Sequence, residues 1–173
     1  MHALLLAITY VLVLGDSNTL RTSGVNLDRA IELRDQYGSQ FLWVKRGGVR
    51  YLIRDRATID QIDRLFDETQ SMRPDMDRLH DRMRPVERRE TELEHKIDAI
   101  SDRDEDDEEI SAADQARLHD LERELRDVEA KLRVFEREEE ALDKKMDAAE
   151  QEAERRMVPI VDEAIRKGLA KRE

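Results

Sequence analysis

Two long stretches of the chain place an apolar residue alternately every four and every three positions. They cover residues 72–100 and 118–153, and each contains one glutamate in the repeat, Glu90 and Glu139. This spacing forms an apolar stripe along a helix, the pattern of a coiled coil. The repeat positions are Met72, Met76, Leu79, Met83, Val86, Glu90, Leu93, Ile97 and Ile100, then Leu118, Leu121, Leu125, Val128, Leu132, Phe135, Glu139, Leu142, Met146, Ala149 and Ala153.

An acidic stretch, SDRDEDDEE, separates the two runs and has no hydrophobic periodicity, which predicts a solvated loop over residues 101–110. Folding the runs back at this loop predicts an antiparallel coiled-coil hairpin over residues 57–157. Glu90 would then face Val128, and Glu139 would face Leu79, so the two glutamates do not meet. The same repeats also permit pairing between chains in a homodimer.

Residues 27–37 are predicted to form a helix, with Asn26 as the N-cap and Gly38 as the C-terminal stop. Residues 40–54 then contain two strand-like runs separated by Gly47-Gly48. This is the signature of a β-hairpin, because both turn positions favour a positive φ. Such a loop pairs Arg46 with Val49, Val44 with Tyr51 and Leu42 with Ile53.

The predicted hairpin has apolar residues on both faces, so helices are expected to cover both. Leu42, Val44, Tyr51 and Ile53 lie on one face. The other carries aromatic and basic side chains, which suggests a recognition surface on an otherwise acidic protein. The predicted binding residues are Phe41, Trp43, Lys45, Arg50 and Arg54. Alternatively, Trp43 belongs to the core and the arginines pair with acidic helix faces.

Thr58 and Gln61 are spaced as a capping box, which predicts the start of the first long helix. Pro74 is expected to break or restart this helix, and Pro85 to kink it. The second long helix has no internal glycine or proline before Pro159. Residues 158–173 are predicted to form a separate C-terminal amphipathic helix. It would pack on the small domain formed by the predicted helix and β-hairpin, which we call the head.

Residues 3–14 form a continuous apolar run that is too short for a bilayer-spanning helix, which needs about 20 residues. Residues 1–15 are therefore predicted to be a signal peptide, although Met1-His2 provides no basic residue before the run. A buried β-strand is the alternative, because the run is rich in strand-forming residues. With the signal peptide removed, the head would comprise residues 16–56 and the protein would be periplasmic or secreted.

The composition changes this picture in three respects. Charged residues make up 42% of the 173 positions and aromatic residues 4%, which suits long solvated helices better than a compact globule. The net charge of -11 disfavours sequence-independent nucleic-acid binding. The absence of cysteine excludes disulfides and thiolate metal sites. The histidines show no ligand spacing, and neither a cofactor nor a metal is expected.

One short motif points to catalysis. The segment VLVLGDSNT resembles the nucleophile block of the SGNH (GDSL-type) hydrolases, which would make Ser17 the nucleophile. Asp77 and His80 match the spacing of that family's other two triad members. However, the family has an α/β sandwich fold, the Gly-x-Asn-Asp oxyanion block is absent, and Asp77 and His80 fall within the heptads. Hydrolysis is therefore kept as a minor alternative.

The segment FLWVKRGGVRYLIRD (residues 41–55), the charged heptads and the closing IVDEAI (residues 160–165) resemble a group of uncharacterised bacterial envelope proteins. Similar segments occur outside the protease domain of membrane metallopeptidases of the beta-lactam-sensing type. The resemblance implies an extracytoplasmic accessory or sensory module. The zinc-protease motif is missing, so the resemblance assigns no catalytic residue.

The predicted fold class is mainly α: a long antiparallel helical hairpin with a small α+β head that contains one β-hairpin. The predicted function is non-enzymatic, namely binding of a protein or cell-envelope partner through the head, without a stable membrane span. A cytosolic homo-oligomeric coiled-coil scaffold is the alternative, and solution mass separates the monomer from the homodimer.

Overall fold

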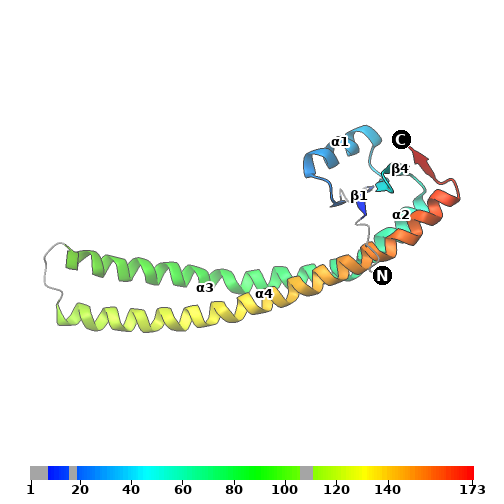
Figure 1. Cartoon of the computed structure of the whole chain (residues 1–173). Helices are drawn as coiled ribbons and strands as arrows, with labels where there is room; N and C mark the ends of the chain where they lie inside the picture. The colour runs from blue at the N-terminus through cyan, green and yellow to red at the C-terminus, as the bar shows by residue number, and fades with distance from the viewer. Residues whose placement is uncertain (1–7, 16–18, 106–110) are drawn as a thin grey trace. The chain divides into compact units, whose positions relative to one another are not determined.

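The structure is a computed structural model that describes residues 8–15, 19–105 and 111–173 (Figure 1). It divides into two compact units. The sheet unit comprises Met1–Thr69 and Ala148–Glu173, and the helical unit comprises Gln70–Asp147. The described residues are mainly helical, and the strands all belong to one sheet.

The sheet contains five antiparallel strands in the order β2-β1-β3-β4-β5. They are β1 (Thr9–Leu14), β2 (Thr19–Ser23), β3 (Phe41–Arg46), β4 (Val49–Ile53) and β5 (Ala170–Arg172). The predicted hairpin, β3 and β4, is present, but it is not isolated. It lies inside a larger sheet to which both ends of the sequence contribute strands.

The β3–β4 hairpin has the predicted register. Arg46 pairs with Val49, Val44 with Tyr51, and Leu42 with Ile53. Gly47 and Gly48 have φ values of 57° and 81°, as a primed two-residue turn requires. The alternation of apolar residues and the turn glycines together determine this register, because a shift by one residue would exchange the two faces.

The later part of the N-terminal apolar run forms β1, an interior strand of the sheet, as the strand alternative predicted. Thr9–Leu14 pairs with β2 on one side and with β3 on the other. Cleavage after Gly15 would remove this strand from the sheet. The signal peptide itself stays a prediction, since residues 1–7 lie outside the described part of the chain.

Helix α1 (Leu27–Tyr37) begins and ends as predicted. The Asn26 side chain accepts a hydrogen bond of 3.0 Å from the backbone N–H of Arg29. The prediction for the next helix was wrong at its start. Helix α2 (Arg56–Asp63) is capped by Asp55, whose carboxylate accepts hydrogen bonds from the backbone N–H and the hydroxyl of Thr58.

Both faces of the sheet are covered by helices, as the hairpin pattern predicted, but to different extents. One face packs on α2, the short helix η1 (Arg64–Phe66) and the last turns of α4 (Ala112–Arg166). The other face packs on α1 alone. The first core includes Tyr10, Leu12, Leu42, Val44, Ile53, Ile59, Ile62, Phe66, Met157 and Val161. The second comprises Val11, Val13, Ala30, Leu33, Phe41, Trp43 and Leu52.

The helical unit contains α3 (Asp67–Glu105) from Gln70 onward and the first part of α4. Every predicted repeat position is buried or partly buried, whereas most flanking positions are exposed. One cluster joins Val86 and Leu93 of α3 to Leu121, Leu125, Val128, Leu132 and Phe135 of α4. The two helices, which run side by side in Figure 1, therefore pack through residues of the predicted apolar stripes.

Three predicted boundaries were wrong. Helix α3 passes through Pro74 without a break, and the kink expected at Pro85 stays a prediction. The helix extends to Glu105, so residues 101–105 of the expected loop are helical, and residues 106–110 lie outside the described residues. Helix α4 continues through Pro159 to Arg166, and the chain then enters β5. The C-terminal segment, residues 158–173, is thus a helix end followed by a strand. It packs on the sheet as expected, through residues that include Val158, Val161, Ala164 and Ile165.

Within the described residues, none of the helices combines the length and apolar character needed to cross a membrane.

Candidate functional site

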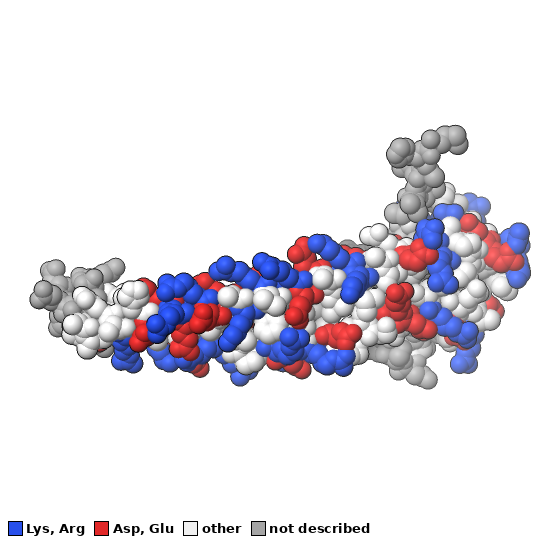
Figure 2. Space-filling model, turned by 90° about the horizontal axis from the view of Figure 1, so that it is seen from below, with Lys and Arg blue, Asp and Glu red and all other residues white. Residues whose placement is uncertain are grey.

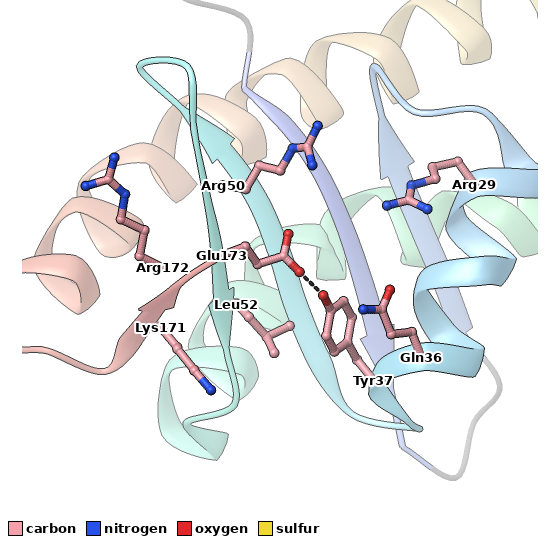
Figure 3. Close-up of a pocket in the computed structure, with 8 residues that line it drawn as sticks. All are labelled: Arg29, Gln36, Tyr37, Arg50, Leu52, Lys171, Arg172 and Glu173. Atoms are coloured by element: carbon pink, nitrogen blue, oxygen red, sulfur yellow. Dashed lines mark hydrogen bonds between the residues drawn. The ribbon is translucent and has the colours of Figure 1, made fainter.

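A groove lies on the α1 side of the sheet, between α1 and the strands β4 and β5 (Figure 3). It forms because α1, the single helix packed on this face, covers the core over β1 and β3 and leaves part of β4 and β5 open. Its volume is about 430 Å³. We call it the basic groove, and it is lined by Arg29, Gln36, Tyr37, Arg50, Leu52, Lys171, Arg172 and Glu173.

A carboxylate occupies the floor of the basic groove. The Tyr37 hydroxyl donates a hydrogen bond to Oε1 of Glu173, and the indole Nε1 of Trp43 donates one of 2.8 Å to Oε2. The backbone N–H of Glu173 also donates to the carbonyl of Arg50, at 3.1 Å. Tyr37 and Trp43 thus bind both oxygens of one carboxylate, and the strand pairing fixes its position.

Basic residues also line this groove. Arg50, Lys171 and Arg172 are exposed, and none of them has a carboxylate partner among the ion pairs of the described residues. Arg29 forms an ion pair of 2.7 Å with Glu32. Lys45 lies directly opposite Arg50 in the β3–β4 ladder. Like charges in directly opposed positions destabilise a sheet, so folding alone does not favour this arrangement.

A second hollow of about 450 Å³ adjoins the basic groove. It shares Tyr37, Leu52 and Lys171 with the groove and adds Arg54, Asp55 and Leu169. The Arg54 guanidinium donates a hydrogen bond of 3.1 Å to the backbone carbonyl of Tyr37. The Leu169 side chain is 41% exposed and contributes apolar surface to this hollow. The open surface therefore combines cations with a small apolar area.

The structure separates the five predicted binding residues into two groups. Lys45, Arg50 and Arg54 are exposed on the α1 side of the sheet. Phe41 is fully buried and Trp43 is 6% exposed, so the prediction that they form a binding surface was wrong. They are core residues beneath α1, which is the alternative that the sequence left open for Trp43. Trp43 still contacts the groove, through its indole N–H.

Sequence reasoning missed the contribution of β5. Lys171, Arg172 and Glu173 are more than a hundred positions from the hairpin, in a segment predicted to be helical. The sequence signal that could have found them is Gly168. It has a φ of 72° and ends the helix region, so that a strand can follow.

A separate polar cluster lies within and at the edge of the other core. The guanidinium of Arg21 lies 4.8 Å from the centre of the Phe66 ring and 3.7 Å from the Asp63 carboxylate. Burial raises the pKa of Asp63 more than Arg21 lowers it. Burial, aided by Glu154 and Glu150, also raises the pKa of the Tyr10 hydroxyl. Tyr10 is fully buried beside Phe66, whereas the Asp63 side chain is 34% exposed at the edge of this core.

In the helical unit, the two glutamates of the repeats differ in their surroundings. Glu139 is 2.9 Å from Nε2 of His80. Glu90 is surrounded by carboxylates, and partial burial together with Glu94, Glu129, Glu136 and Glu87 raises its pKa. Among the described residues, no three metal-binding side chains converge on one point.

The structure shows no interaction between the two described members of the triad considered for a hydrolase, Asp77 and His80. Asp77 is exposed on α3, and His80, on the same helix, pairs with Glu139. Ser17 lies outside the described residues. The expectation that Ser17 is a nucleophile therefore stays a minor alternative without a described site.

Comparison with known proteins gave no match to a family model, to a curated protein or to a solved structure. The resemblance of residues 41–55 to bacterial envelope proteins therefore stays a prediction.

Proposed function

We propose that this is a non-enzymatic binding protein, and that the basic groove recognises a negatively charged segment of a protein partner. The observation that carries the proposal is the carboxylate of Glu173, bound by Tyr37 and Trp43 in a groove that the cations Arg50 and Lys171 also line. The residues lining the groove include no serine, cysteine or histidine. They provide charge and hydrogen-bond donors rather than a nucleophile with its base.

A protein carboxylate fits this surface better than a nucleic acid or a membrane does. The chain has a net charge of -11, and acidic side chains cover much of it, so a long polyanion would be repelled outside the groove. On the side seen in Figure 2, Lys and Arg are interspersed with Asp and Glu along the helices. A short segment that enters the groove avoids this repulsion.

For the long helices, we propose a spacer formed by an antiparallel coiled-coil hairpin within one chain. The contacts of Val86 and Leu93 with Leu125, Val128 and Leu132 support this pairing. Two ion pairs between the helices, Arg82–Glu138 and Arg89–Glu124, also join positions related by an antiparallel arrangement. A homo-oligomeric scaffold would require these stripes to separate and pair between chains. Mass in solution distinguishes the two.

An extracytoplasmic accessory or sensory role is the setting that the envelope-protein resemblance suggests. We retain it as part of the proposal, with the chain remaining uncleaved at residue 15 because β1 is needed for the sheet. Intact mass of the native protein from envelope and cytosolic fractions tests both points. A chain cut near residue 15 would contradict the fold proposed for the mature protein.

The binding proposal is tested with a fluorescently labelled oligoglutamate peptide and the full-length protein, with oligolysine of the same length as the ligand control. Arg50→Glu with Arg54→Glu, two exposed positions on either side of Leu52, should weaken oligoglutamate binding by at least about tenfold, the equivalent of about 1.4 kcal/mol. Arg88→Glu with Arg117→Glu, an equal change of charge on exposed positions of the helical unit, is the matched control. Equal losses in both variants would contradict a specific groove.

A further inference from the structure

We infer that β5 is a replaceable strand, and that the partner is an extended acidic peptide that pairs with β4 in its place. Glu173 then marks the position where a carboxylate of the partner binds. This inference rests on the proposed function of the basic groove and specifies the conformation of the ligand. Addition of a strand to a sheet edge is a common mode of peptide recognition, in which backbone hydrogen bonds provide affinity and alternate side chains provide specificity.

The strand β5 is held by few apolar contacts. It contains three residues at the edge of the sheet, and it follows Gly168, whose φ of 72° lets the chain turn away from α4. Of the residues in β5, Ala170 contacts the core, and it is only partly buried. Lys171 and Arg172 are exposed. Replacing β5 therefore exposes little apolar surface, which keeps the free-energy cost low.

The charges of β5 also match those of β4 poorly. Lys171 pairs with Leu52, which lies between Arg50 and Arg54, and Arg172 pairs with Tyr51. Neither cation has a carboxylate partner among the described residues. Glu173 is the one acidic side chain that β5 and its end bring into the groove. A strand with carboxylates in place of these cations would be attracted to the surface where β5 is partly repelled.

The register predicts where the partner needs its carboxylates. Successive side chains of a strand point to opposite faces, so positions equivalent to residues 171 and 173 both face the groove. Figure 3 shows Lys171 and Glu173 on this side, together with Arg50, Leu52 and Tyr37. The expected ligand is therefore an extended segment with acidic residues at alternate positions. A peptide of the same composition with its acidic residues in one block should bind more weakly.

A reversible covalent link between β4 and β5 tests the replacement. Because Glu173 N–H donates to the Arg50 carbonyl, Tyr51 and Arg172 form the next, non-hydrogen-bonded pair, where the backbones lie closest. This spacing accommodates a disulfide. The natural chain has no cysteine, so Tyr51→Cys with Arg172→Cys introduces one defined bond. The oxidised and reduced forms of this variant have the same sequence, so each controls for the other.

Two labelled peptides of the same composition are the ligands. In the first, glutamate and threonine alternate; in the second, the glutamates form one block and the threonines another. The reduced variant should bind the alternating peptide, and oxidation should weaken binding at least about tenfold. Equal binding by the oxidised and reduced forms would overturn the replacement of β5 while leaving the groove proposal intact. Failure of the wild-type protein and the reduced variant to bind any acidic peptide would instead overturn the proposed function, and this inference with it.

A second variant tests the role of Glu173 without a disulfide. Glu173→Gln removes the carboxylate that competes for the groove, so binding of the alternating peptide should become several-fold tighter. Glu136→Gln removes one negative charge from an exposed position of the helical unit and is the matched control for a general electrostatic effect. Equal tightening in the two variants, or no change in either, would contradict competition by Glu173.

Discussion

The indole N–H of Trp43 donates a hydrogen bond of 2.8 Å to the Glu173 carboxylate, across 130 positions of sequence. It connects a buried residue of β3 with the residue that follows β5. The Trp43 side chain therefore belongs both to the core on the α1 side and to the floor of the basic groove. A change in the occupancy of the groove should be detectable at Trp43, and a change at Trp43 should affect the stability of the sheet.

Trp43→Ala should lower the free energy of unfolding by about 3 kcal/mol, because it creates a cavity among Val11, Phe41 and Leu52. Trp43→Phe should cost less, since it keeps most of the buried area and loses the hydrogen bond to Glu173. Urea denaturation followed by circular dichroism measures both. An unchanged free energy of unfolding for Trp43→Ala would mean that Trp43 is a surface residue after all.

Leu93→Ala should lower the free energy of unfolding of the helical unit by about 2–4 kcal/mol, because Leu93 is fully buried against Val128 and Leu132. Val134→Ala is the control, since Val134 is 50% exposed, and its effect should stay within about 0.5 kcal/mol. Thermal and urea denaturation test the pair. Similar effects of the two substitutions would contradict the packing of α3 on α4.

The same substitution should have opposite effects at two glutamates of the helical unit. Glu90 has a raised pKa, so its protonated form favours the folded state, and its contribution to stability is lost as the pH rises through that pKa. Glu90→Gln should therefore stabilise the protein at neutral pH. The hydrogen bond from Lys144 lowers the pKa of Glu140, so its contribution is present at neutral pH and is lost on acidification.

Glu140→Gln should accordingly be slightly destabilising at neutral pH and neutral in acid, where the carboxyl is protonated. Denaturation curves of the wild type and both variants at neutral pH and near pH 2 measure the difference. Stabilisation by both variants at neutral pH would point to the net negative charge of the chain as the cause, rather than to the surroundings of Glu90.

A chain that starts at residue 16 should lose the folded sheet, because β1 provides the hydrogen-bond partners of both β2 and β3. Far-ultraviolet circular dichroism should retain helix signal, while the emission of Trp43 shifts toward that of an exposed indole. A truncated chain with native Trp43 emission and unchanged cooperativity of unfolding would show that the sheet folds without β1. It would also restore the signal-peptide prediction for residues 1–15.

The sequence predicts the elements whose side-chain pattern repeats. The heptads identify the buried positions of both long helices, and Gly47-Gly48 identifies the register of the hairpin. The apolar run that forms β1 lacks alternation because both of its faces are buried, which is why it also matches a signal peptide. Strand β5 is short and mostly polar, and only its pairing with β4 defines it.

The prolines show why tertiary packing overrides a local rule. A proline inside a helix removes one hydrogen bond and costs about 3 kcal/mol. Pro74, Pro85 and Pro159 are all exposed, so water can reach the carbonyl groups that lose their partners. The apolar stripe on the opposite side of each helix stays packed. The sequence shows the prolines but not which side of the helix they will occupy.

The candidate site was predicted in part. Lys45, Arg50 and Arg54 were identified from a basic cluster within one hairpin, and they remain on the open surface. Lys171 and Glu173 join them only because β5 pairs with β4. No local pattern in the sequence indicates a contact between segments so far apart. The residues that the edge strand β5 adds to the site could therefore be identified only from the structure.

The most direct test of the groove follows the indole N–H of Trp43 by nuclear magnetic resonance in the ¹⁵N-labelled full-length protein. The chain has a single tryptophan, so this group gives one resonance. Addition of the peptide with alternating glutamate and threonine should shift that resonance in a saturable manner, because a new carboxylate replaces Glu173 as its acceptor. The peptide whose glutamates form one block should cause a smaller shift at the same concentration. An indole resonance that stays unchanged while the peptide binds would place the binding site elsewhere and contradict the account.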